Sequence, residues 1–224
     1  MANKIQLVYV ISDGLFLLMG VFILAFAIIV NNVKDEVPTN GRQAARNLLY
    51  QGFPLTAGIV NAVFIFVTFL VTLPGLATSS RKWIKLAGYM AVVCAMFSMI
   101  LGLYVWILTL KARGDFAPLF AAQSDQVKSL MQTEFSCCGY VNSTSPAFVT
   151  DATCPSKAAA AIMRGCATAI SSFANVFLDN IFTALFGIVG FDAVFVMATV
   201  CLLKDRKERE RFRHIDEKNG VGRI

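Results

Sequence analysis

Four long apolar runs alternate with polar segments along the chain. They cover residues 5–30, 55–77, 84–110 and 181–203, and Asp13 is the only ionisable residue within the first of them. A helix rises 1.5 Å per residue, so about 20 apolar residues cross the roughly 30 Å hydrocarbon core of a bilayer. The pattern predicts an all-α integral membrane protein with four transmembrane helices.

The first run has a competing interpretation as a secretory signal peptide. The apolar region of a signal peptide is about 7 to 15 residues long and is followed by a small-residue cleavage site. The run over residues 5–30 is much longer. We therefore expect residues 1–30 to stay in the protein as a short N-terminal segment and the first transmembrane helix.

Basic residues indicate the orientation of the helices. Four helices put both termini on one side, together with the turn over residues 78–83 and the basic tail over residues 204–224. Lysines and arginines concentrate on this side, which the positive-inside rule places in the cytoplasm. Residues 31–54 and 111–180 then form a small and a large extracellular loop.

The two outer loops differ in their patterns. The small loop has Pro38 and Gly41 and lacks a strong period, so we expect it to be mostly irregular. In the large loop, apolar residues at helical spacing from Val127 to Phe135 follow Ser124, which suits an N-cap. A second helical pattern after Ser156 leads directly into the fourth run. The large loop is thus predicted to be a small helical subdomain.

Four of the six cysteines lie in the large loop, at Cys137, Cys138, Cys154 and Cys166. About seventy residues rarely build a sufficient core without cross-links, and an even number of cysteines outside the cell favours disulfides. Adjacent Cys137 and Cys138 can hardly bond each other, which leaves a nested and a crossed pairing. A zinc site is disfavoured because thiolate sites belong to reducing compartments.

Composition excludes most enzyme classes. Hydrophobic residues make up 57% of the chain and charged residues only 15%, against about a quarter charged in ordinary globular proteins. The single histidine, His214, stands in the charged tail. The sequence therefore argues against a mechanism that needs a histidine base and against a histidine-rich metal site. We expect no catalysis, no metal, no cofactor and no nucleic-acid partner.

The motif Cys137-Cys138-Gly139 in the large loop, followed by Cys154 and Cys166, resembles the tetraspanin family over the whole chain. The resemblance implies the nested pairing, Cys137 with Cys166 and Cys138 with Cys154. It also implies a non-enzymatic organiser of plasma and endosomal membranes. Such a protein recruits lipids and other integral membrane proteins into microdomains, through its transmembrane helices and the irregular region over residues 140–153. Self-association into a homo-oligomer is a further expectation.

Two segments of the sequence resemble one subgroup of the tetraspanin family. Residues 47–62, NLLYQGFPLTAGIVNA, and residues 73–79, LPGLATS, are similar to fungal tetraspanins associated with appressorium-mediated host penetration. The resemblance implies a role in that infection structure. The chain departs from the family because it lacks juxtamembrane cysteine clusters. Only Cys201 is placed for palmitoylation, with a small buried apolar residue as the alternative, and Cys94 is expected to be a packing residue.

Polar residues inside the apolar runs form a second group of candidates. In the family, polar residues at matching places line an intramembrane cavity that accepts a sterol in some members. The resemblance therefore implies Asp13, Asp192 and Asn61 as candidates for binding a sterol or another lipid. In the alternative, Asp13 reaches headgroup water and Asp192 hydrogen-bonds a neighbouring helix through Asn61. A different function, a small transporter or proton-coupled channel, would use Asp13 and Asp192.

Two further features lie outside the membrane. Asn142-Ser143-Thr144 is an N-glycosylation sequon in the large loop, with a plain turn asparagine as the alternative. The tail from Lys204 alternates in sign and carries a net positive charge. It is predicted to extend the fourth helix into solvent, with binding to anionic headgroups as the alternative.

Overall fold

The computed structural model describes residues 2–78 and 80–218. Met1, Ser79 and residues 219–224 lie outside the described residues. The predictions that fall on them therefore have no structural counterpart. These are the first residue of the N-terminal segment, Ser79 in the turn and in the LPGLATS segment, and the end of the basic tail.

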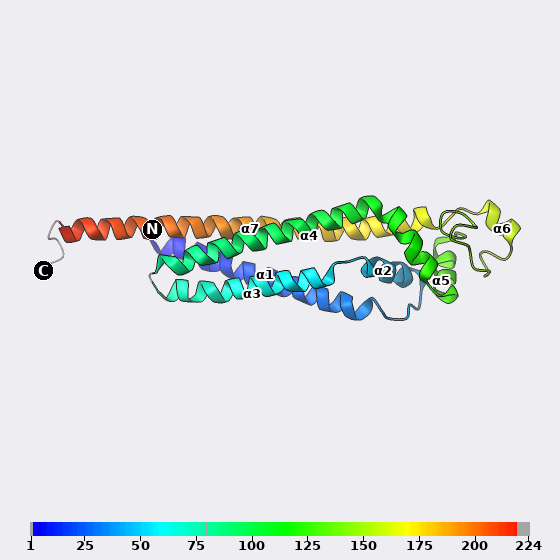
Figure 1. The fold of residues 1–224 in the computed structure, drawn as a ribbon, viewed down its shortest axis with the longest axis horizontal. Helices are drawn as coiled ribbons and strands as arrows, with labels where there is room; N and C mark the ends of the chain where they lie inside the picture. Colours follow the sequence, from blue (N-terminus) through cyan, green and yellow to red (C-terminus); the bar gives the residue numbers. More distant parts are fainter. Residues whose placement is uncertain (1, 79, 219–224) are drawn as a thin grey trace. The chain divides into compact units, whose positions relative to one another are not determined.

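The described residues are almost entirely helical (Figure 1). An isolated antiparallel bridge between Thr144 and Ala147 is the one β feature within them. The helices are α1 (Ala2–Val33), α2 (Gly41–Gln51), α3 (Leu55–Ala77), α4 (Arg81–Ala122), α5 (Asp125–Phe135), α6 (Lys157–Ile162) and α7 (Ala167–Lys218). Four of them, α1, α3, α4 and α7, are long and apolar enough to cross a membrane. This confirms an all-helical chain with four candidate membrane spans.

The small loop is not mostly irregular, and that prediction is wrong. Residues 41–51 form helix α2, which begins where the Asn40 side chain accepts a hydrogen bond from the Gln43 N–H at 2.8 Å. Its buried face contains Ala44, Ala45, Leu48 and Leu49. This spacing is the helical period, but it extends over only three turns and is interrupted by polar residues. The helix is stabilised by packing against α5, where Gly41 allows close approach to Leu130.

The large loop is helical, but its second helix is divided. Helix α6 ends at Ile162, and Met163 is extended with ψ 149°. Helix α7 then begins at Ala167, immediately after the disulfide-bonded Cys166. The predicted uninterrupted helix from Ser156 into the fourth span is therefore wrong, because the disulfide holds this part of the chain in a bend.

The chain forms two compact units. Unit 1 comprises Met1–Ala25, Thr56–Leu101 and Leu185–Ile224, and unit 2 comprises Phe26–Leu55 and Gly102–Ala184. Tyr9, Phe16 and Phe195 lie in the core of unit 1, where Phe16 and Phe195 stack with ring centroids 4.7 Å apart.

The outer surface of unit 1 carries large apolar side chains. Leu18 and Phe22 on α1, and Met96 and Ile100 on α4, are all more than half exposed. Burying an apolar side chain releases roughly 1.5–3 kcal/mol, so leaving many of them in water would be unfavourable. This surface suits contact with lipid.

Candidate functional sites

Two disulfides hold the large loop of unit 2 together. Cys137 is bonded to Cys166 and Cys138 to Cys154, which is the nested pairing that the resemblance implies. All four cysteines are fully buried. The bonds connect the end of α5 to the start of α7 and to the segment before α6. The loop is therefore a cross-linked subdomain.

Gly139 gives the Cys-Cys-Gly motif its backbone path. Its φ is +70°, a conformation that favours glycine, and a Cβ at this position would collide with the carbonyl oxygen of Asn142. The turn lets the Gly139 carbonyl accept the Cys166 N–H at 2.9 Å, next to the disulfide. The motif thus supplies a cross-link and the turn that the cross-link needs.

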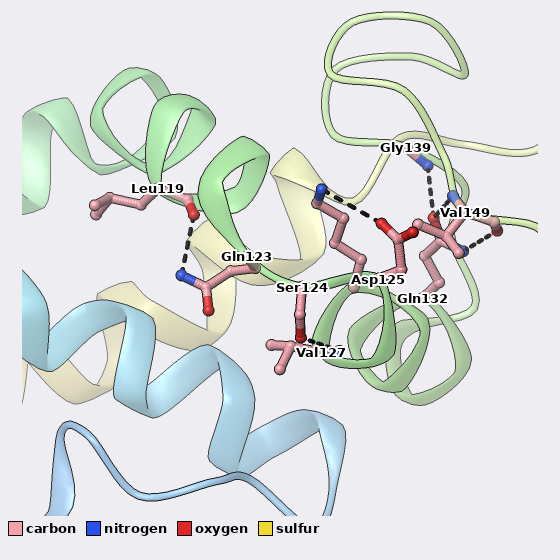
Figure 2. Close-up of polar contacts among 9 residues, drawn as sticks. Leu119, Gln123, Ser124, Asp125, Val127, Gln132, Gly139 and Val149 are labelled. Carbon is pink, nitrogen blue, oxygen red and sulfur yellow. Dashed lines mark hydrogen bonds and ion pairs between the residues drawn. The ribbon is translucent and has the colours of Figure 1, made fainter.

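Gln132 on α5 is a buried polar residue that organises the same turn. Its side chain is fully buried, and Figure 2 shows it reaching toward Gly139 and Val149. Its Nε2 donates to the Val149 carbonyl at 2.8 Å and to Asp151 Oδ2 at 2.7 Å. Its Oε1 accepts the N–H groups of Val149 at 3.0 Å and Gly139 at 3.4 Å. One amide therefore joins α5 to both ends of the 139–151 segment.

Asp151 and Tyr140 add two further supports. Asp151 Oδ1 accepts the N–H groups of Thr153 and Cys154 at 2.8 and 2.7 Å. The Tyr140 hydroxyl donates to the Arg113 carbonyl on α4 at 2.8 Å, and its ring packs on Phe120. Burial raises the pKa of Tyr140 to about 12. The region predicted to be irregular, 140–153, is thus held by specific polar contacts at its two ends.

Asn142 lies on the surface of this region. Its side chain is exposed, and its Oδ1 accepts hydrogen bonds from the Thr144 N–H and hydroxyl, each at 2.9 Å, and from the Ser145 N–H. The turn that was given as the alternative is therefore present. Exposure leaves the sequon accessible, and glycosylation stays a prediction.

Asp13 in α1 is buried, so the alternative in which it reaches headgroup water is contradicted. It is 2% exposed, and its Oδ2 accepts the Thr72 hydroxyl from α3 at 2.8 Å. Its Oδ1 is buried without a hydrogen-bond partner among the described residues. Thr72 provides a partner on a neighbouring helix, which sequence periodicity did not reveal.

Asp192 and Asn61 also lie inside unit 1, both fully buried. Asn61 Nδ2 donates to Ser98 Oγ on α4 at 2.9 Å instead of bonding Asp192. Ser98 is the hydrogen-bonding neighbour of the Asp192 carboxyl, although within the described chain neither carboxyl oxygen has a contact of strict hydrogen-bond geometry. The alternative in which Asp192 bonds a neighbouring helix through Asn61 is therefore contradicted in its choice of partner, because Asn61 bonds Ser98.

The three sterol-site candidates share this burial. Asp13 is 2% exposed, and Asn61 and Asp192 are fully buried. Sterol binding stays a prediction.

The two free cysteines differ in exposure. Cys94 is buried, with its sulfur 3.6 Å from the Thr68 hydroxyl, as expected of a packing residue. Cys201 is exposed on α7, which contradicts the alternative of a small buried apolar residue. Its side chain is accessible to acylation, which stays a prediction.

The helical extension of α7 is fixed to the turn between α3 and α4. Arg206 Nη1 donates to the carbonyl oxygens of Gly75 and Thr78 at 2.9 and 3.0 Å, and Arg81 pairs with Glu210 at 2.7 Å. The predicted helical tail is present through Lys218. The first residues of this tail contact the turn between α3 and α4, whereas the prediction was a helix surrounded by solvent.

The chain matches no protein-family model, no curated protein and no solved structure.

Proposed function

We propose that this chain is a tetraspanin-type organiser of the plasma and endosomal membranes, acting without catalysis. The observation that carries the proposal is the combination of four helices of spanning length with a Cys-Cys-Gly subdomain that is cross-linked by two buried disulfides. Disulfides persist in oxidising compartments, which favours an extracellular subdomain and cytoplasmic termini. The same resemblance implies that the protein organises the membrane while a fungal infection structure penetrates its host.

The proposed mechanism is lateral recruitment. Exposed apolar side chains such as Leu18 and Ile100 would contact lipids and the helices of other integral membrane proteins. The region over residues 140–153 would give selectivity outside the cell, because the disulfides and Gln132 present it as a shaped surface. A rigid surface loses little conformational entropy when it binds a partner.

The experiment is crosslinking in native membranes, followed by mass spectrometry of the purified chain. We expect integral membrane proteins among the crosslinked products. Replacing residues 141–148 with a Gly/Ser segment should remove a subset of them, whereas the matched control Lys157→Gln, an exposed residue of α6, should remove none.

Proteoliposome flux tests the alternative function. The organiser proposal predicts no ion or proton flux above that of empty liposomes. Flux that disappears in Asp192→Asn, together with a lack of crosslinked membrane proteins, would contradict the organiser proposal. It would favour a small transporter or proton-coupled channel.

A further inference from the structure

Unit 2 has a hollow of about 380 Å³ where α2, α5 and the first turns of α7 meet. It lies outside the disulfide cluster, and none of the features discussed above uses it. The residues that line it are Asn40, Arg42, Gln43, Arg46, Glu134 and Phe173.

The wall of the hollow presents mainly hydrogen-bond donors. Asn40 Oδ1 accepts the Gln43 N–H, and Gln43 Oε1 accepts the N–H and hydroxyl of Thr39. Both amide oxygens already accept hydrogen bonds, and the NH₂ groups of Asn40 and Gln43 are donors that the two side chains offer to a ligand. Two guanidinium groups add further donors. Such a wall suits a ligand that accepts hydrogen bonds.

The positive charges of Arg42 and Arg46 are neutralised to different extents. They stand one turn apart on α2, where like charges repel each other. Arg42 Nε contacts Glu134 Oε1 at 2.8 Å, and its side chain is 73% exposed. Arg46 lies over the Tyr50 ring at 5.7 Å, and within the described residues its buried Nε has no hydrogen-bond partner. The hollow therefore holds two positive charges, one negative charge and an unsatisfied buried donor.

The chemistry of the hollow selects one kind of anion. A guanidinium binds a carboxylate through two parallel N–H···O bonds, and the hollow is lined by two guanidinium-bearing side chains, Arg42 and Arg46. Glu134 would repel a doubly charged phosphate more strongly than a singly charged carboxylate. Phe173 offers an aromatic surface beside the charged groups. A carboxylate with an apolar neighbour matches each of these features.

We infer that this hollow is a carboxylate-binding site for an acidic side chain of a partner protein, with an adjacent aromatic residue of the partner packing on Phe173. The choice of a protein as the source of the carboxylate rests on the proposed organiser function. The binding chemistry itself rests only on the contacts within unit 2.

Direct binding of short blocked peptides to the full chain in nanodiscs tests this inference. The probes are a peptide containing Glu-Phe, the same peptide with Gln-Phe, and inorganic phosphate. The Glu-Phe peptide should bind at least about tenfold more tightly than the Gln-Phe peptide, since one charge-assisted hydrogen-bonded pair accounts for that ratio. Added salt should weaken its binding.

Three variants locate the binding. Arg46→Lys keeps the charge but removes the planar fork, and it should weaken Glu-Phe binding about tenfold. Glu134→Gln removes the competing carboxylate and should strengthen it about threefold or more. Lys157→Gln, the control, lowers the net charge by one away from the hollow and should change nothing.

The opposite results overturn the inference. Equal binding of the Glu and Gln peptides, phosphate binding tighter than peptide binding, or an unchanged affinity in both Arg46→Lys and Glu134→Gln would each do so. Crosslinked membrane partners recovered alongside a failed peptide assay would leave the organiser function standing and remove the carboxylate site alone.

Discussion

Two buried polar side chains, Gln132 in unit 2 and Asp192 in unit 1, differ in how well they are hydrogen-bonded. In unit 2, both ends of the Gln132 amide are hydrogen-bonded, and its partners lie in the turn that it supports. In unit 1, the Asp192 carboxyl is equally buried, yet its neighbour Ser98 lies outside strict hydrogen-bond geometry in the described residues. A buried polar group stabilises a fold only when its hydrogen bonds are made. We therefore expect the Gln132 side chain to stabilise the fold and the Asp192 side chain to destabilise it.

The largest expected effect comes from the cross-links of unit 2. Replacing Cys137 and Cys166 together by serine removes a disulfide that closes a separation of 29 residues. Chain entropy makes such a closure worth about 3–4 kcal/mol. Hydrogen exchange of residues 124–170 in nanodiscs should rise strongly, while the exposed free thiol variant Cys201→Ser should exchange like the wild type. Unchanged exchange in the double variant would show that packing alone maintains the loop.

Gln132 should give the next largest effect. Gln132→Met keeps the volume but leaves the N–H groups of Gly139 and Val149 without their acceptor, at a cost of about 2–3 kcal/mol. The measurement is the exchange rate of residues 139–151. Gln123→Met, which removes one bond to the Leu119 carbonyl (Figure 2), is the control and should cost less than about 0.5 kcal/mol. Equal effects of the two variants would contradict the organising role of Gln132.

Asp192 should respond with the opposite sign. Asp192→Leu replaces a buried carboxyl that lacks a well-formed hydrogen bond with an apolar group, and it should stabilise unit 1 by about 1–2 kcal/mol. Asp13→Leu loses the bond from Thr72 and should stabilise the unit less. Thermal unfolding in the same detergent compares the two. Destabilisation by Asp192→Leu of similar size to that by Gln132→Met would remove the contrast between the two residues.

Tyr140 should give the smallest effect and a dependence on pH. Tyr140→Phe removes the bond to the Arg113 carbonyl and should cost about 1 kcal/mol at neutral pH. The folded pKa of about 12 lies above the ordinary value of about 10. The stability from the neutral phenol is therefore complete below pH of about 10 and is lost as the pH rises toward 12. Unfolding curves of the two proteins should converge over this range, and a constant difference would show that Tyr140 titrates normally.

Sequence patterns predicted local features well. The apolar runs predicted the four long helices, and Ser124 caps α5 as its position indicated, accepting from the Val127 N–H at 3.5 Å (Figure 2). These features depend on residues close together in the chain. Helix α2 was missed because its stability comes from Leu48 and its neighbours packing in unit 2, and its local period is short.

Long-range polar contacts could not be predicted. The partners of Gln132 lie 7 to 19 residues away, and Thr72 lies 59 residues from Asp13. A glutamine or threonine is common in many environments, so its type carries no signal of such a role. The nested disulfides were reached only through the family resemblance, because local geometry left the crossed pairing open.

The most direct test of the central claim is thiol labelling of intact cells with a membrane-impermeant maleimide, before and after mild reduction. The account places the Cys-Cys-Gly subdomain outside the cell as a doubly disulfide-bonded unit. It predicts no labelling of Cys137, Cys138, Cys154 and Cys166 before reduction and labelling of all four afterwards, without permeabilisation. Free thiols at these positions that react only after the cells are permeabilised would contradict the topology and the proposed organiser function with it.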